Sequence, residues 1–134
     1  MDFSAYISTP KNTTSAAPKI TTLILTRGRL NGGFLFFPSG PAGLLHVLAK
    51  VGGHQILPFN PGESFRLDDC TISFSMGIDM LEPPFDIDII TWNDSNNYAH
   101  SLTICFYLTP SRIKKPFIKT IKDAFSSTDG YQKS

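Results

Sequence analysis

Alternation of apolar and polar residues is the feature that most constrains this chain. In residues 70–77 (CTISFSMG), apolar or sulfur-bearing side chains occupy every second position and hydroxyl-bearing side chains lie between them. Residues 85–92 (FDIDIITW) and 99–108 (AHSLTICFYL) repeat the pattern. Successive side chains of a strand point to opposite faces, so a period of two indicates strands with one buried face. The alternation therefore predicts a half-buried antiparallel sheet.

Five further segments have strand-like composition and are separated by turn signals. They are residues 19–27, 33–37, 44–51, 54–59 and 64–68. The turns between them are rich in Gly, Pro and Asn, as in GRLNGG, PSGPAG and NPGES. Pro58 predicts that its segment is an edge strand or that the proline lies near the end of the strand. About eight strands at roughly ten-residue spacing are typical of a sandwich or barrel. We expect an all-β fold, an antiparallel β-sandwich of jelly-roll type.

The two ends of the chain differ from this centre. Residues 1–19 are rich in Ser, Thr, Ala and Pro with little apolar pattern, which predicts an extended N-terminal arm that a neighbouring subunit would hold in place. In residues 111–134 the period changes: Pro116 suits a first helical turn, and apolar residues then recur at a spacing of four. We therefore expect an arm (1–19), a sandwich (20–110) and a basic tail (111–134) with a short amphipathic helix.

Charge is distributed unevenly along the sequence. Residues 1–62 carry five basic residues and one acidic residue, and residues 111–134 carry six basic and two acidic residues. Residues 63–110 carry one basic and eight acidic residues, although the net charge of the whole chain is only +1. Basic ends around an acidic centre favour contacts between like copies or with an acidic partner. A solvated surface without a partner is the alternative.

Two cysteines in 134 residues exclude a disulfide-rich scaffold. By strand parity Cys70 belongs to an apolar face and Cys105 to the more polar face of its strand, so we do not expect them to pair. No apolar run approaches the roughly 18 residues of a membrane span, and the start MDFSAYISTPKNTTS does not have the pattern of a signal peptide. These features predict synthesis in a reducing cytoplasm, with a virion as the final location if the chain is viral.

Metal ligation has weak support in the sequence. The three histidines lack the close paired spacing of ligand sets; they are His46, His54 and His100. Asp86 and Asp88 lie on the same side of one predicted strand, and Asp68 and Asp69 fall in a turn. Such pairs attract a hard cation or a basic partner, but carboxylates on a solvated face are the alternative. We predict no metal and no cofactor.

The segment WNDSNNY, residues 92–98, joins two predicted strands and is the candidate ligand-binding tip. Aromatic side chains at its ends, Trp92 and Tyr98, could stack on a sugar ring. Polar side chains between them could bond to hydroxyl groups; they are Asn93, Asp94, Asn96 and Asn97. We favour the simpler interpretation, in which Trp92 caps the core and the asparagines only form the turn.

The tail is the candidate partner-binding segment. The side chains that we expect to contact a partner are Lys114, Lys115, Phe117, Lys119, Ile121, Lys122 and Phe125. A basic helix can bind nucleic acid or an anionic membrane, but five basic residues between Arg112 and Lys122 are few for independent binding. We expect its apolar stripe to pack on the sandwich or on a neighbouring subunit.

No catalytic pattern stands out, so we predict a protein that is not an enzyme. No serine lies in a strand–turn–helix elbow, and the glycine turns lack the lysine of a phosphate-binding loop. The terminal extensions and the segregated charge favour a structural assembly protein, specifically a small virion component such as a minor capsid, cementing or vertex protein. Its expected partners are copies of itself or other shell proteins. The alternative is a carbohydrate-binding, lectin-like module that uses the Trp92–Tyr98 loop.

Overall fold

The computed structural model describes residues 1–58, 60 and 62–111, and this part of the chain contains eight strands and no helix. The strands are β1 (Asp2–Thr9), β2 (Lys19–Ile24), β3 (Gly28–Phe37), β4 (Leu45–Val51), β5 (His54–Leu57), β6 (Cys70–Met80), β7 (Asp86–Asn93) and β8 (His100–Pro110). The helix predicted after Pro116 lies outside the described residues.

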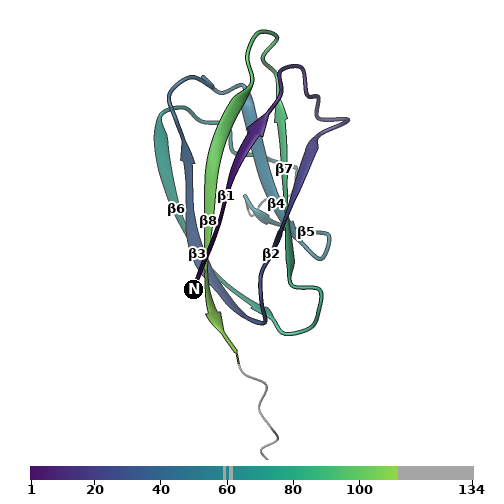
Figure 1. Ribbon diagram of the computed structural model, residues 1–134, viewed down its shortest axis with the longest axis vertical. Coiled ribbons are helices and arrows are strands. Elements are labelled where there is room, and N and C mark those ends of the chain that lie inside the picture. The colour runs from purple at the N-terminus through teal and green to yellow at the C-terminus, as the bar shows by residue number, and fades with distance from the viewer. Residues whose placement is uncertain (59, 61, 112–134) are drawn as a thin grey trace, which may run out of the picture.

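The strands form two four-stranded antiparallel sheets that face each other (Figure 1). Sheet A has the order β1-β8-β3-β6, and sheet B has the order β2-β7-β4-β5. The predicted antiparallel two-sheet β architecture is confirmed. The predicted edge position of residues 54–59 is also confirmed, since β5 is the outer strand of sheet B and Pro58 follows it directly.

One hydrophobic core lies between the sheets. The predicted alternation is confirmed in β7, where Ile87 and Ile89 are wholly buried and the aspartates beside them are half-exposed. The inward side chains of β8 meet them from the other sheet; they are Leu102, Ile104, Phe106 and Leu108. Both sheets contribute their inward side chains to this one core. The register of each strand is therefore fixed, because a shift by one residue would turn its apolar side chains to solvent.

The expectation of an extended arm over residues 1–19 is wrong for residues 2–9, which form β1. This strand pairs with β8 along its whole length, and the amino group of Met1 donates a hydrogen bond to the carbonyl of Leu108 at 3.1 Å. Ile7 and Thr9 point inward and are buried. Two of the four outward residues of β1 are serine and a third is Asp2, and this polar half of the alternation made the segment resemble a linker.

Two local predictions are also corrected. The sequence GRLNGG was expected to form a turn, but it lies within β3, where the register shifts between Leu30 and Gly32. A Cβ at Gly33 would overlap the carbonyl oxygen of Cys105, so glycine is required there by the close approach of β3 and β8. Residues 64–68 were expected to form a strand, but they contribute only an isolated bridge between Val47 and Phe65.

Both cysteines are free. Cys105 has the outward parity that the sequence predicts, but its side chain is buried because β8 runs between β1 and β3. Burial raises the pKa of the Cys105 thiol, and the negative charge of Asp2 raises it further. Among the residues that the structure describes, none belongs to a helix of the length and apolarity needed to span a membrane.

Candidate functional site

The loop between β7 and β8 is organised by an asparagine that faces inward. Asn93 is wholly buried, and its amide nitrogen donates to the carbonyls of Thr9 and Tyr98 at 3.1 and 2.9 Å. Its side-chain oxygen accepts a bond from the backbone N–H of Ser95. The side chain of Asn93 is therefore used inside the protein and is not presented to a ligand. Tyr98 is 70% exposed at the tip of the loop, and Asn96 and Asn97 are exposed beside it.

Trp92 lies on the outer face of sheet B, so the expectation that it caps the core is wrong. Its parity on β7 is opposite to that of the buried Thr91 and Asn93. Directly across from it on β4 is His46, and the two rings stack with centroids 4.8 Å apart and planes 11° from parallel. One face of the indole is thus covered by the imidazole.

His46 links two loops through both of its ring nitrogens. Nδ1 lies 2.9 Å from the hydroxyl oxygen of Ser64, and Nε2 lies 2.8 Å from a carboxylate oxygen of Asp94. An ionised carboxylate can only accept, so Nε2 carries the proton; in the neutral ring Nδ1 then accepts from Ser64. We call Ser64, His46, Asp94 and Trp92 the His46 cluster.

The His46 cluster contains the residue types of a hydrolase relay, a hydroxyl, an imidazole and a carboxylate in one hydrogen-bonded chain. The ring is reversed relative to that template, in which the hydroxyl bonds to Nε2 and the carboxylate to Nδ1. The two loops that carry these partners are also anchored through the backbone, one to β4 by the residue after Ser64 and the other to the residue before β4. Val47 and Phe65 exchange two hydrogen bonds of 3.0 and 2.9 Å, and the N–H of Asp94 donates to the carbonyl of Leu44. The cluster thus holds two loops against the outer face of sheet B.

The three histidines lie on different strands, because His54 begins β5 and His100 begins β8. Within residues 1–58, 60 and 62–111, no three or more His, Cys, Asp or Glu side chains form a group that could hold a metal ion. The Asp68 carboxylate accepts bonds of 2.9 Å from the backbone N–H groups of Gly40 and Ala42. These bonds lower the pKa of Asp68, so this carboxylate stabilises the loop between β3 and β4.

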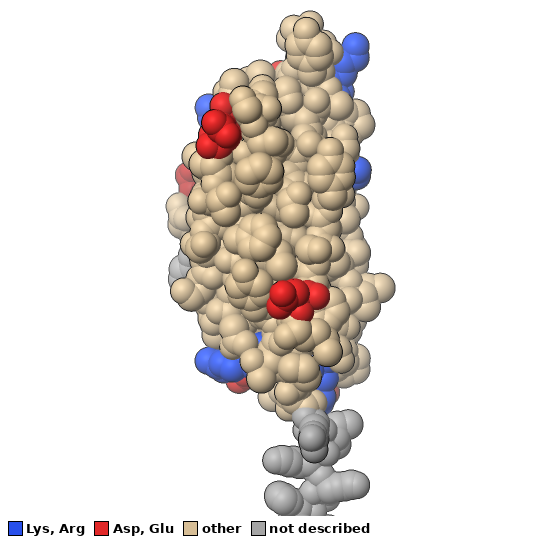
Figure 2. Space-filling view, turned by 60° about the vertical axis from the view of Figure 1, so that its left-hand side comes forward, with Lys and Arg blue, Asp and Glu red and all other residues tan. Residues whose placement is uncertain are grey.

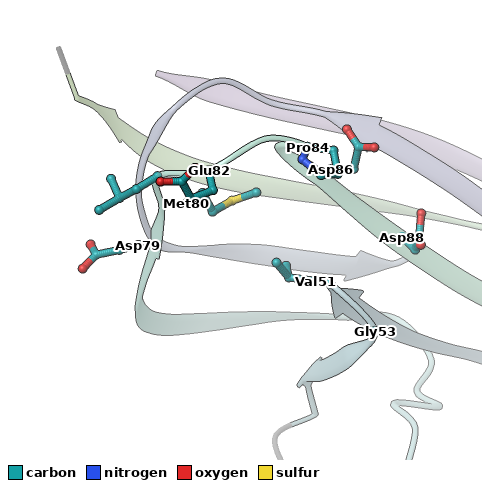
Figure 3. Close-up of a pocket in the computed structure, with 10 residues that line it drawn as sticks. Val51, Gly53, Asp79, Met80, Glu82, Pro84, Asp86 and Asp88 are labelled. Atoms are coloured by element: carbon teal, nitrogen blue, oxygen red, sulfur yellow. The ribbon is translucent and has the colours of Figure 1, made fainter. Parts of the chain in front are cut away.

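An acidic cleft of about 470 Å³ opens at one end of the sandwich (Figure 3). It is lined by the turn between β4 and β5, by the end of β6 with the connection that follows, and by the first half of β7. Four of its lining residues carry carboxylates: Asp79, Glu82, Asp86 and Asp88. The sequence had singled out Asp86 and Asp88 but not the other two, which only the fold brings beside them.

The carboxylates of the acidic cleft are spread along it and do not converge. Asp86 and Asp88 project from the same side of β7, whereas Asp79 points away at the opposite end (Figure 3). Asp79 pairs with Arg29 at 2.8 Å, and Asp88 accepts a hydrogen bond of 2.8 Å from the hydroxyl of Thr22. A metal ion needs several oxygen ligands that converge on one point. Carboxylates that are spread along a cleft are better suited to pairing with several basic side chains.

The central part of the outer face of sheet A is nearly free of charge, and the Arg29–Asp79 ion pair lies in the row beyond it. Its central twelve positions form three rows across the four strands, and the sheet register defines each row. The rows are Tyr6–Thr103–Phe36–Thr71, Ser4–Cys105–Phe34–Ser73 and Asp2–Tyr107–Gly32–Ser75. Asp2 is the single charged residue among the twelve, and it lies on an edge strand. Figure 2 brings the β6 side of the molecule forward, and the few charged side chains in view form small separate groups.

Aromatic side chains are exposed within these rows. Tyr6 is 73% exposed, and Phe36 and Tyr107 are each about two-fifths exposed. Phe34 and Tyr107 lie beside each other with ring centroids 6.5 Å apart. The sequence reasoning assigned these residues to strands, or in the case of Tyr6 to the arm, and did not identify the surface that they share.

The tail residues that the sequence singled out lie outside the described residues. They are Lys114, Lys115, Phe117, Lys119, Ile121, Lys122 and Phe125. The described chain ends with Ser111, directly after β8 and at the same end of the sandwich as the acidic cleft.

No family model matches the chain, and no curated protein matches it.

Proposed function

We propose that the sandwich is a jelly roll. The support is its nested pairing: β1 pairs with β8, β2 with β7, β3 with β6 and β4 with β5. This is the pairing of one long antiparallel hairpin that has been wrapped so that successive pairs alternate between two sheets. Eight strands in two such sheets define the jelly-roll architecture.

The function that the geometry supports best is that of a non-enzymatic structural protein that assembles with copies of itself through the outer face of sheet A. The observation that carries this proposal is the group of exposed aromatic side chains, Tyr6, Phe36 and Tyr107, on the central part of a face with one charge among its twelve positions. Interface cores are depleted in charged residues and enriched in Tyr and Phe. Hydroxyl groups around the aromatics provide hydrogen bonds at little desolvation cost.

We further propose that the assembly is a virion shell, in which this chain serves as a minor capsid, cementing or vertex protein. The support is an analogy of fold, since jelly rolls include viral capsid domains. The uneven charge adds to it, because a basic tail and an acidic centre on one chain favour contacts between copies. Lectins share the architecture, so the choice between the two functions depends on the surface that is used.

The oligomeric state tests the proposal directly. Light scattering after size-exclusion chromatography should give a mass above the monomer, which falls to the monomer mass in Tyr6→Lys/Phe36→Lys. A matched control is Ile20→Lys/Ile24→Lys, because these two apolar residues are 59% and 71% exposed on the edge strand of the other sheet. The control should keep the wild-type mass. A wild-type chain that stays monomeric at all concentrations, and also after mixing with candidate shell components, would overturn the assembly proposal.

A second candidate is glycan binding at the β7–β8 loop. The observation that favours it is the 70% exposure of Tyr98 next to the exposed Asn97. Trp92 is held in place by His46, and Asn93 is withdrawn into the core, so the site would be smaller than the sequence suggested. A glycan array distinguishes the two functions. Specific glycan binding that is lost in Tyr98→Ala and Trp92→Ala supports this function, and the absence of binding to any glycan supports assembly.

A further inference from the structure

One edge of sheet A has no partner strand within the described residues. β6 is the outer strand of that sheet and has eleven residues, whereas β5, the outer strand of sheet B on the same side, has only four. Within residues 1–58, 60 and 62–111, no strand, bridge or loop hydrogen bond engages the outer edge of β6. A row of its backbone N–H and C=O groups is therefore available to a further strand.

The core is also incomplete along β6. The inward side chains of β7 are all buried, whereas those of β6 from Cys70 to Ile78 are only half-buried. A groove of about 360 Å³ lies beside them, lined by Ile56 and Phe65 from one side and by Met76 and Ile78 from the other. A strand added to the edge of β6 would cover these apolar side chains as well as the backbone groups.

The other edge strands are protected against such pairing. β5 is short and Pro58 follows it directly. On the far side of the sandwich, Lys19 of β2 donates to the carbonyl of Ser8 on β1 at 2.7 Å, and a lysine at an edge opposes the addition of a strand. Residues 70–78 contain neither a charge nor a proline. The irregularity in the pairing of β6 with β3 lies beyond Ser75, so residues 70–75 form a regular and unprotected edge.

The sequence of β6 is complementary to itself. From 70 to 78, even-numbered positions hold apolar or sulfur-bearing side chains and odd-numbered positions hold Thr, Ser or Gly. A two-fold axis perpendicular to the sheet would pair two copies of β6 antiparallel and keep their inward faces on the same side, so that even positions meet even positions. With the axis at Ser73, Ile72 opposes Phe74 and Thr71 opposes Ser75. No charged side chains meet in this arrangement.

We propose that β6 pairs antiparallel with β6 of a second copy about a two-fold axis at Ser73, which joins two four-stranded sheets A into one continuous sheet. The outward residues of β6 belong to the nearly uncharged face, so the pairing extends that face across two copies (Figure 2). Residues 70–76 are far fewer than the roughly 20–30 residues a side of a stable interface, so this second contact is weak and forms at millimolar concentration. It is separate from the face contact of the proposed function.

Cross-linking across the axis tests the register. Paired residues of antiparallel strands have Cα atoms roughly 4.5–5.5 Å apart, which is within disulfide range. Ser73→Cys should therefore form a disulfide between the two introduced thiols under mild oxidation, and peptide mass spectrometry separates this link from links of the native Cys70. The measurement is made at millimolar concentration in Tyr6→Lys/Phe36→Lys, in which the face contact is removed.

Ser4→Cys is the matched control, because Ser4 is exposed in the same row of the face as Ser73 but lies on the opposite edge strand. Ser73→Cys should link about tenfold faster than the control, since only paired strands hold two sulfurs at bonding distance. Equal rates would overturn the pairing of β6. The comparison is made without the face contact, so failure of the edge contact is distinguished from failure of the proposed function.

Amide hydrogen exchange in the same background gives an independent measurement. Alternate N–H groups of an edge strand point to solvent, so a rise to millimolar concentration should slow the exchange of every second amide in residues 70–76 about fivefold. Ser73→Lys should abolish this slowing, because it places like charges opposite each other, whereas Ser4→Lys should preserve it. Exchange that does not depend on concentration, or a slowing that persists in Ser73→Lys, overturns the proposal.

Discussion

His46 and Trp92 lie directly opposite each other on β4 and β7, with parallel rings 4.8 Å apart between centroids. The stack lies on the outer face of sheet B, away from the core. Ser64 and Asp94 hold the imidazole from its two nitrogens, so two loops and two strands meet at one side chain.

Replacement of His46 by alanine should lower the free energy of unfolding by about 2 kcal/mol, from the lost ring stack and two lost hydrogen bonds. Urea unfolding measures the loss. His54→Ala is the control, since that histidine is exposed and should change stability by less than about 0.5 kcal/mol. The chain has one tryptophan, so a changed native-state emission in His46→Ala reports Trp92 specifically. Unchanged emission and stability would contradict the described stack.

Gly33→Ala should destabilise the protein severely, by about 3 kcal/mol or more, because the new Cβ would overlap the backbone carbonyl of Cys105 on the neighbouring strand. Gly77→Ala is the matched control on β6. Its Cβ would meet only the guanidinium end of Arg29, a flexible side chain that can move aside. The loss there should stay below about 1 kcal/mol. Thermal or urea unfolding of the two variants should differ clearly, and equal losses would argue against the close approach of β3 and β8.

The amides of Gly40 and Ala42 should titrate with the carboxylate of Asp68. Their hydrogen bonds lower the pKa of Asp68 below its ordinary 3.8, so their contribution to stability is full above that value. It is lost as the pH falls through the lower pKa of the folded state. Amide chemical shifts recorded against pH should show a midpoint below 3.8.

Asp68→Asn should abolish that titration, and Asp69→Asn should leave it intact. The second variant is a suitable control because Asp69 has a φ of 49°, a conformation that asparagine also adopts readily. A midpoint at or above the ordinary value would show that the two bonds do not persist in solution.

Cys105 should be alkylated more slowly than Cys70 at every pH up to about 9. Burial raises the pKa of the Cys105 thiol, which lowers its thiolate fraction, and the side chain is also less accessible. Iodoacetamide labelling followed by mass spectrometry gives both rates. In denaturing urea the difference should disappear, and a faster reaction of Cys105 in the native protein would contradict its burial.

The alternation in residues 70–77, 85–92 and 99–108 was sufficient to predict strands and inward faces, because period-two patterning is a local property of the chain. It failed for β1, whose eight residues are held by pairing with β8 about a hundred positions away. A second non-local contact, the close approach of β3 to β8, explains Gly33. A Gly-Gly pair resembles a turn until the neighbouring strand is known to lie against it.

The candidate surfaces also depend partly on local sequence pattern and partly on non-local contacts. Asp86 and Asp88 share a face by sequence alone, but Glu82 and the exit of the tail join them only at one end of the folded sandwich. Ser64 and Asp94 lie 18 and 48 residues from His46, and no spacing rule connects them.

The sequence by itself determined the strands whose alternation is strong, such as β6, β7 and β8, and which of their faces is apolar, since side-chain direction and hydrophobicity are fixed residue by residue. Only the tertiary structure decided which strands are neighbours, and therefore which outward side chains form a common surface. Sheet order is set by burying all the inward faces at once, a condition that no single segment contains.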